Sequence, residues 1–150
     1  MKLLYKILTI VCLSGILASC ADLEIQKLND KASFKAAAIT APAAISLTAA
    51  DIDPDSKSTV TFEWTAAEFG VDVAVNYTLS AKIGSKEADL FAGLVGVTSH
   101  QVKASELYAK LSALGVGSSA SVAFTVKATI GSDFDVITSE EKQISVTIKK

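Results

Sequence analysis

Apolar and polar side chains alternate along most of the chain between residues 45 and 148, with the period of two that is typical of β-strands. Residues 87–96 and 97–102 alternate less regularly and predict two shorter strands, the first at a sheet edge. In the clear runs one face is apolar and the other polar, as in an antiparallel sheet with one solvated side. These clear runs predict strands at Ile45–Thr48, Val60–Trp64, Val73–Ile83, Val122–Ile130 and Ile144–Ile148.

One segment follows the period of an amphipathic helix instead. In Ser105–Gly115, the side chains of Leu107, Leu111 and Leu114 fall on one face. Ser105 is a residue type that commonly caps a helix N-terminus, and Gly115 is typical of the position just past a helix end. The pattern therefore predicts a short helix between the late strands.

About seven strands separated by turn signals, such as Asp51–Ser56, favour an all-β fold. We expect an immunoglobulin-like or fibronectin III-like β-sandwich with one short helix between late strands. Residues 45–150 form this domain in our interpretation. Four aromatic residues are in phase with the aliphatic face of their strands and are expected in the core: Phe62, Trp64, Tyr77 and Phe124.

The first twenty residues have the pattern of a targeting signal. Lys2 and Lys6 form a short basic region before an eleven-residue apolar run, Ile7–Leu17, which is shorter than the ~20 residues that span a bilayer. We interpret residues 1–19 as a signal peptide. The sequence L-A-S-C at residues 17–20 resembles a bacterial lipobox, which implies cleavage before Cys20 and a diacylglycerol on its sulfur. An ordinary cleaved signal with an incidental cysteine is the alternative, and residues 20–44 are interpreted as the lipidated cysteine and a tether.

Composition restricts the chemistry further. The chain has 150 residues, a formal charge of −2, one histidine and no arginine, which argues against a nucleic-acid-binding surface. Cys12 would leave with the signal peptide and Cys20 would carry lipid, so we expect no disulfide and no cysteine nucleophile in the domain. Residues 1–19 hold two lysines and no acid, so their removal changes the charge from −2 to −4. We therefore expect lipid, and not charge, to hold the protein on a membrane.

Four motifs occur in an order that resembles a known family. They are V-T-F-E-W-T at residues 60–65, Y-T-L at 77–79, the helix at 105–115 and V-A-F-T-V-K-A at 122–128. Together with the lipobox, they resemble the SusE N-terminal domain over roughly residues 45–148. Asp22 and Glu24, just after Cys20, also resemble a sparse form of the acidic tract that marks surface export in such bacteria.

This resemblance implies a lipoprotein on the surface of a Bacteroidetes-type outer membrane, without enzymatic activity or a cofactor. It also implies a TonB-dependent transporter and a partner lipoprotein as neighbours, and a share in holding glycans such as starch. Two features depart from the family. Thr125 stands where the family strand often carries arginine, and the carbohydrate-binding modules of longer members do not follow Lys150. The resemblance thus implies fold and location more strongly than glycan binding.

Few residues have the pattern of a catalytic or metal-binding site. His100 is a candidate base or metal ligand, but neither an H-x-E motif nor a second histidine accompanies it, which favours a surface histidine on a strand. Asp51, Asp53 and Asp55 have the spacing that begins an EF-hand loop, but its glycine and glutamate positions hold other residues, which favours a carboxylate-rich turn. No spacing selects a carboxylate pair for glycoside hydrolysis. We therefore predict no catalytic and no metal site.

A sugar-binding surface commonly needs an exposed aromatic side chain. Phe69, Phe91, Tyr108 and Phe134 lie outside the clear strand periods, and Phe69, in a loop before Gly70, is the best candidate among them for an exposed ligand platform. The alternative for Phe69 is a hydrophobic plug under a loop. Two roles remain open: starch-like polysaccharide binding with Phe69 as platform, or a spacer or docking module that contacts a transporter or lipoprotein without binding sugar.

Overall fold

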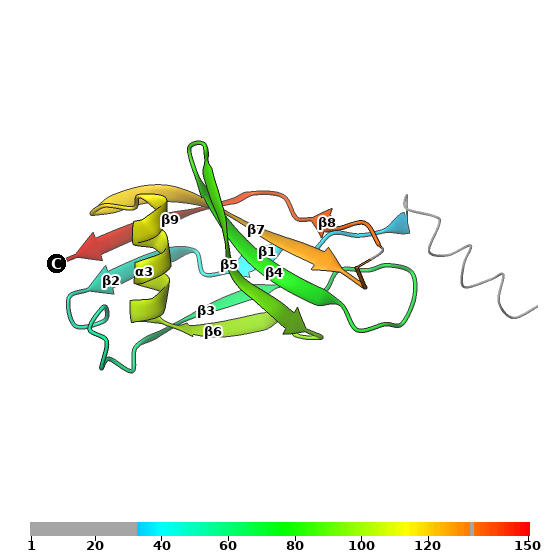
Figure 1. Cartoon of the computed structure of the whole chain (residues 1–150), viewed down its shortest axis with the longest axis horizontal. Coiled ribbons are helices and arrows are strands. Elements are labelled where there is room, and N and C mark those ends of the chain that lie inside the picture. Colours follow the sequence, from blue (N-terminus) through cyan, green and yellow to red (C-terminus); the bar gives the residue numbers. More distant parts are fainter. Residues whose placement is uncertain (1–32, 133) are drawn as a thin grey trace, which may run out of the picture. The chain divides into compact units, whose positions relative to one another are not determined.

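The computed structural model describes residues 33–132 and 134–150 (Figure 1). These residues fall into two compact units. The larger unit comprises Lys35–Glu68 and Val73–Lys150, and the smaller contributes residues 33–34 and 69–72 to the described part. The predicted signal peptide and Cys20 lie outside the described residues. Every strand and the helix discussed below belong to the larger unit.

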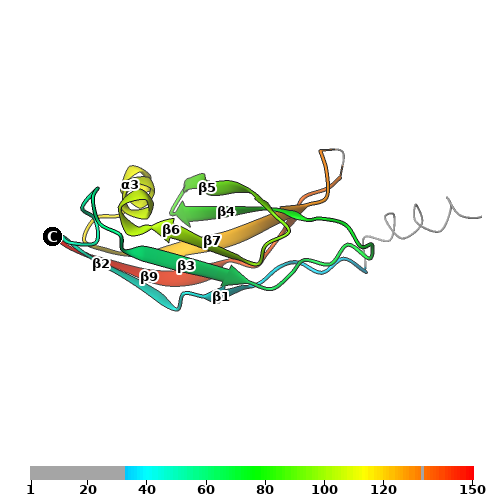
Figure 2. The same ribbon diagram turned by 90° about the horizontal axis from the view of Figure 1, so that it is seen from below.

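The larger unit is a sandwich of two sheets, which Figures 1 and 2 show from two sides. Its strands are β1 (Ile39–Ala41), β2 (Ala44–Thr48), β3 (Thr59–Trp64), β4 (Asn76–Ile83), β5 (Lys86–Val95), β6 (Ser99–Lys103), β7 (Ser119–Thr129), β8 (Ile137–Thr138) and β9 (Lys142–Lys149). One sheet has the order β1-β3-β6, and the other has the order β2-β9-β7-β4-β5, with β8 paired to β7. The β2–β9 pair is parallel, whereas the other pairs are antiparallel. The predicted β-sandwich is confirmed.

The core lies between the inner faces of the two sheets. Phe62 on β3 packs against Phe124 on β7, with ring centroids 5.3 Å apart, and Trp64 on β3 packs against Tyr77 on β4 at 5.7 Å. All four side chains are buried. This confirms the prediction that they belong to the core because they lie on the apolar face of their strands. Offset aromatic pairs of this kind add to the free energy gained from burying their area. They tie the three-stranded sheet to the six-stranded sheet.

The helix α3 (Ala104–Leu114) follows β6 without a loop. The predicted cap at Ser105 is wrong, because the extended Lys103 occupies the N-cap position and makes no side-chain cap hydrogen bond. Ala104 is buried and its N–H donates to the Ser58 carbonyl at 2.9 Å, which makes the strand pass directly into the helix. Gly115 ends the helix as predicted, with the left-handed φ of 106° that favours glycine.

Several strand limits differ from the prediction. β1 lies inside the range interpreted as a tether, and the short β8 had no predicted counterpart. The long strand predicted from Val73 begins only at Asn76. β5 is an edge strand, as predicted, but it is ten residues long and its pairing with β4 shifts register twice. Such bulges interrupt the period of two, which explains the weak pattern in this segment.

Candidate functional site

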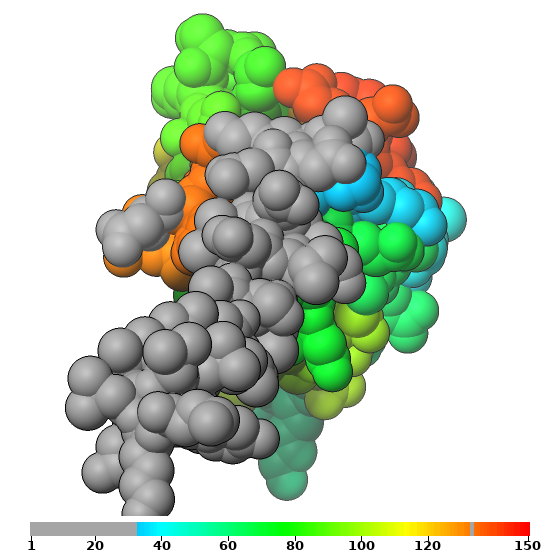
Figure 3. All heavy atoms as spheres, turned by 90° about the vertical axis from the view of Figure 1, so that its right-hand side faces the viewer, coloured from blue at the N-terminus to red at the C-terminus, as the bar shows by residue number. Residues whose placement is uncertain are grey.

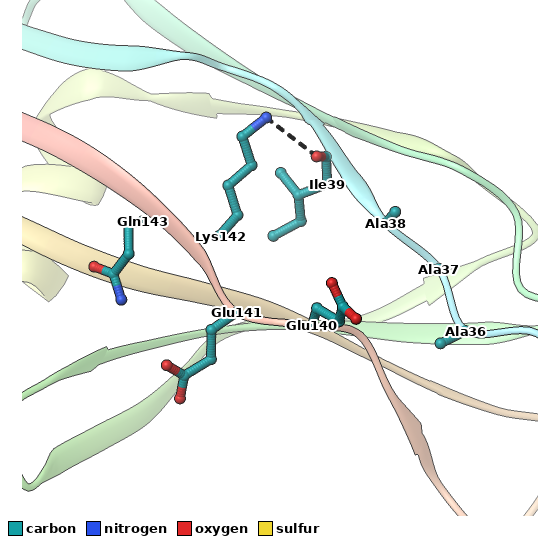
Figure 4. A pocket seen from close by; sticks show the side chains of 8 residues that line it. All are labelled: Ala36, Ala37, Ala38, Ile39, Glu140, Glu141, Lys142 and Gln143. Carbon is teal, nitrogen blue, oxygen red and sulfur yellow. Dashed lines mark hydrogen bonds between the residues drawn. The ribbon is translucent and has the colours of Figure 1, made fainter.

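A groove lies along one edge of the sandwich, between the residues that lead into β1 and those that lead into β9 (Figure 4). Its volume is about 530 Å³, within the range of ligand pockets in proteins. The groove is lined by Ala36, Ala37, Ala38, Ile39, Glu140, Glu141, Lys142 and Gln143.

The groove forms because the chain changes sheets after β1. β2 pairs with β9 only from Ala44 and Ser145 onward, while β1 pairs with β3 in the other sheet. The start of β9 therefore has no strand partner on this side. Instead, the Lys142 ammonium crosses the gap and donates to the Ile39 carbonyl at 3.3 Å and the Thr40 carbonyl at 3.2 Å.

The two walls of the groove differ in chemistry. One wall is small and apolar, from Ala36 to Ile39, and the other carries two carboxylates and an amide. In Figure 4, Glu140 and Lys142 lie on the side of the strand that faces this apolar wall, whereas Glu141 and Gln143 point to the opposite side. The Glu140 and Glu141 carboxylates thus point to different sides of the chain, which does not favour a catalytic pair that flanks one glycosidic bond.

A second, smaller cavity of about 240 Å³ adjoins the first. It lies over β4, β7 and β9 and is lined by Lys82, Gly84, Ser121, Ala123, Glu141 and Gln143. Glu141 and Gln143 line both cavities. We call the two cavities together, with these lining residues, the β9 groove.

Polar side chains in the second cavity are paired with one another. Lys82 forms an ion pair with Glu141 at 3.1 Å, and the Ser121 hydroxyl donates to the Gln143 amide oxygen at 2.9 Å. Both members of the ion pair are about half exposed, and exposed pairs contribute only ~0–1 kcal/mol to stability. A ligand with hydroxyl groups can therefore replace these contacts at small cost.

Phe69 does not have the predicted exposure. Its side chain is only 2% exposed, and its ring packs against Phe34 with centroids 5.2 Å apart. The expectation of an exposed platform is wrong, because an apolar ring in a loop gains free energy by leaving water. A sugar cannot stack on a ring face that is already covered. The structure therefore agrees with the alternative of a hydrophobic plug.

His100 lies on β6 and is part of a small aromatic cluster at the edge of the sandwich. Its ring is 4.9 Å from the ring of Phe91 on β5, and the Lys110 ammonium lies 5.0 Å from the centre of the same phenyl ring. Both His100 and Phe91 are half-buried. His100 thus lies on a strand, as the sequence favoured, but it is half-buried and not on an open surface.

The aspartates at residues 51–55 form a turn that is held by hydrogen bonds. The Asp51 carboxylate accepts from the Thr48 hydroxyl at 2.6 Å, the Ser58 hydroxyl at 2.7 Å and the Thr48 N–H at 2.8 Å. These hydrogen bonds, with that of the Thr48 hydroxyl the strongest, lower the pKa of Asp51 from 3.8 to about 2. Asp53 accepts from the N–H of Asp55 at 2.8 Å. Within residues 33–132 and 134–150, no three His, Cys, Asp or Glu side chains gather as metal ligands would.

Sequence reasoning did not identify the β9 groove. Lys82, Ser121 and Gln143 occupy the polar phase of their strands, so the alternation did indicate a solvated face. It could not indicate that residues 36–39 lie beside residues 140–143. That proximity depends on the change of sheets between β1 and β2, for which the sequence carries no periodic signal.

A comparison with protein families places the chain in a known family. The family model described as SusE outer membrane protein matches residues 22–131, a range that covers most of the chain and ends just after β7. It includes the apolar wall of the groove but not residues 140–143. No curated protein and no solved structure matches the chain. None of the helices in the described part of the chain has the length and apolarity to cross a bilayer.

Proposed function

Because the chain belongs to the SusE outer membrane protein family, we propose that it is a non-catalytic surface lipoprotein of a glycan-uptake system and binds polysaccharide weakly in the β9 groove. In this proposal Cys20 carries the lipid anchor, and the residues between Cys20 and Lys35 connect it to the larger unit, which begins at Lys35. Starch-like polysaccharide is the ligand class, and a TonB-dependent transporter and its partner lipoprotein are the neighbours.

The observation that supports this function is that two cavities lie next to each other along β9. Two adjoining cavities share Glu141 and Gln143, so the groove extends from the apolar wall at residues 36–39 to the outer face of β4 and β7. A polysaccharide is a long ligand with many hydroxyl groups, and carboxylates, an amide, a hydroxyl and an ammonium supply hydrogen-bond partners for them. The alanine wall offers an apolar surface to a sugar ring.

The same features predict low affinity. The polar groups are open to water, so each new hydrogen bond with a sugar replaces one with solvent and contributes only ~0.5–1.5 kcal/mol. The lining residues include no aromatic ring to stack on a sugar. Binding of a long polymer to neighbouring copies of an anchored protein would raise the effective affinity.

Affinity electrophoresis tests this function. The mature chain, with Cys20→Ser to keep it soluble, is run through gels that contain starch or other polysaccharides. The groove variant Glu141→Ala/Gln143→Ala is compared with Glu106→Ala/Gln101→Ala, which makes the same changes of residue type on α3 and β6. We expect starch to retard the parent and the control, and the groove variant to migrate freely. Free migration of the parent in every gel, or equal retardation of all three, would contradict the proposal.

A docking role without sugar is the second candidate. One end of the larger unit exposes several large apolar side chains, which is typical of contact surfaces. In this role the sandwich would contact the transporter or the partner lipoprotein. Co-purification with such a protein after mild solubilisation supports it, and solubilised lipoprotein that purifies alone contradicts it.

A further inference from the structure

The exposed large apolar side chains of the described residues lie at one end of the larger unit. They come from three segments: the approach to β4, the end of β5 with the residues after it, and the connection from β7 to β8. Each is more than two fifths exposed. They are Val73 (46%), Val95 (57%), Val97 (41%), Phe134 (43%) and Val136 (56%).

The strand register places these segments next to one another. Asn76, the first residue of β4, lies opposite Val95 of β5 on one side and Thr129 of β7 on the other. The Gly96 N–H donates to the Val75 carbonyl at 2.8 Å, which brings the segment of Val97 to that of Val73. On the other side, Ile137 pairs with Ala128, so Val136 lies beside the end of β7. We call this surface the apolar end.

The chain enters the larger unit at this same end. Lys35, its first residue, exchanges two backbone hydrogen bonds of 2.9 Å with Glu68 in the β3–β4 connection. The Trp64 N–H at the end of β3 donates to the Thr98 carbonyl at 2.9 Å, which brings the end of β3 next to the segment of Val97. Lys35 and Glu68 also form an exposed ion pair at 3.1 Å, which gives the apolar end a polar rim. Figure 3 views the molecule from this side.

The opposite end of the sandwich differs. There Thr48 of β2 pairs with Lys149 of β9, and the aspartate turn at residues 51–55 follows. Among the described residues of this end, no large apolar side chain is exposed. The two ends are separated by the length of β7, an eleven-residue strand that spans about 36 Å.

We propose that the apolar end rests on the lipid surface of the membrane that holds the anchor. This inference rests on the lipid at Cys20 in the proposed function. Cys20 precedes Lys35 by fifteen residues, so the chain from the lipid anchor reaches the apolar end first. The opposite end of the domain is farther from the anchor by the length of the sandwich. Valine and phenylalanine side chains enter the boundary between headgroups and acyl chains favourably. Attachment to the same membrane gives even a weak contact a high effective concentration.

The contact orients the groove. The β9 groove begins beside the apolar end, at Ala36, and extends along the edge of the sandwich, because its second cavity reaches Gly84 and Ser121 toward the other end of β4 and β7. A domain that rests on the apolar end therefore leaves the second cavity open to ligands from outside.

Site-specific fluorescence on the lipidated protein tests this placement. With Cys20 lipidated, the mature chain has no other thiol, so Val97→Cys and Val136→Cys can each carry one environment-sensitive NBD fluorophore. Lys57→Cys, in the connection from β2 to β3 at the opposite end, is the matched control. Each protein is reconstituted in vesicles of phosphatidylethanolamine and phosphatidylglycerol, with and without spin-labelled lipid, and the mass of each confirms the diacylglycerol.

We expect the emission of the labels at residues 97 and 136 to shift to shorter wavelength and to be quenched by spin-labelled lipid, while the label at residue 57 does neither. Equal emission and no quenching on lipidated protein would overturn the placement and leave the proposed function intact. A shift to shorter wavelength without lipid quenching would also overturn it, because it would show a protein contact. If the mature protein carries no diacylglycerol, it has no lipid anchor. That result would contradict both this inference and the anchored form of the proposed function.

Discussion

The Lys142 ammonium donates to the carbonyl of Ile39 at 3.3 Å and so joins the start of β9 to β1, a strand of the other sheet. The two residues are 103 positions apart in the sequence. Their contact spans the place where the sandwich has no strand-to-strand pairing. It therefore fixes the relative position of the two walls of the β9 groove.

Replacing Lys142 with methionine should destabilise the domain. Methionine keeps most of the apolar stem but removes the donor to two backbone carbonyls, and a hydrogen bond from a charged group contributes about 1.5 kcal/mol when it is partly exposed. Urea unfolding of the Cys20→Ser mature chain measures the change. Lys57→Met, at an exposed lysine, is the control, and an equal effect of the two substitutions would show that the Lys142 contact does not stabilise the fold.

Tyr77→Phe should cost about 2 kcal/mol of unfolding free energy. The Tyr77 hydroxyl oxygen accepts a hydrogen bond from the buried Ala67 N–H at 3.0 Å. Without that oxygen the N–H stays buried and unpaired, while the ring keeps its packing against Trp64. Tyr108→Phe on the half-buried side of α3 should change the free energy by less than ~1 kcal/mol. A smaller loss for Tyr77→Phe than for Tyr108→Phe would contradict this role.

Asp51 should contribute a pH-dependent part of the stability. Hydrogen bonds from Thr48 and Ser58 lower its folded-state pKa from 3.8 to about 2. A carboxyl group whose pKa is lower in the folded state stabilises the fold above its unfolded pKa and loses that effect as the pH falls toward the folded value. Urea unfolding between pH 5 and 2 should therefore show a steeper loss of stability on acidification for the parent than for Asp51→Asn.

Asp55→Asn serves as the control for the titration of Asp51. It alters the same turn but leaves the hydrogen bonds of Thr48 and Ser58 to Asp51 in place. Its stability should fall with pH as steeply as that of the parent. If Asp51→Asn has the same pH profile as the parent, the hydrogen bonds do not act on the fold as we infer.

Phe69→Ala should affect stability and not sugar binding. The ring is buried against Phe34, and truncation of a buried phenylalanine to alanine typically costs about 3 kcal/mol or more. At a temperature where the variant stays folded, we expect starch gels to retard it as they retard the parent. Loss of retardation in a variant with unchanged circular dichroism would instead place Phe69 at a binding site.

The sequence predicted the parts of the structure that follow from local periodicity. Phe62, Phe124 and Tyr77 were placed in the core by alternation alone, and Gly115 ended the helix by its conformational freedom. The prediction of Ser105 as the N-cap was wrong because the helix begins one residue earlier. The Ala104 N–H donates to the Ser58 carbonyl there, a long-range contact that the local sequence does not indicate. The expectation for Phe69 was wrong because a loop has no repeating pattern of apolar residues that would indicate whether a side chain is buried.

The sequence did not predict the candidate site, because the site also depends on contacts between distant parts of the chain. Glu141 and Gln143 were visible as polar positions on a strand, but the groove depends on their distance from Ala36–Ile39 across the edge of the sandwich. Only the change of sheets between β1 and β2 creates that proximity. The pattern of apolar residues defines the inner faces of a sandwich, and it carries little information about which edges remain open.

The binding of polysaccharide in the β9 groove can be tested most directly by nuclear magnetic resonance. Starch-derived oligosaccharide is titrated into the ¹⁵N-labelled mature chain with Cys20→Ser, and backbone amide shifts are followed residue by residue. We predict concentration-dependent shifts at residues 36–39 and 140–143, and none at residues 91, 100 and 110 of the aromatic cluster. Shifts confined to that cluster, or no shifts at saturating oligosaccharide, would contradict a sugar site in the groove.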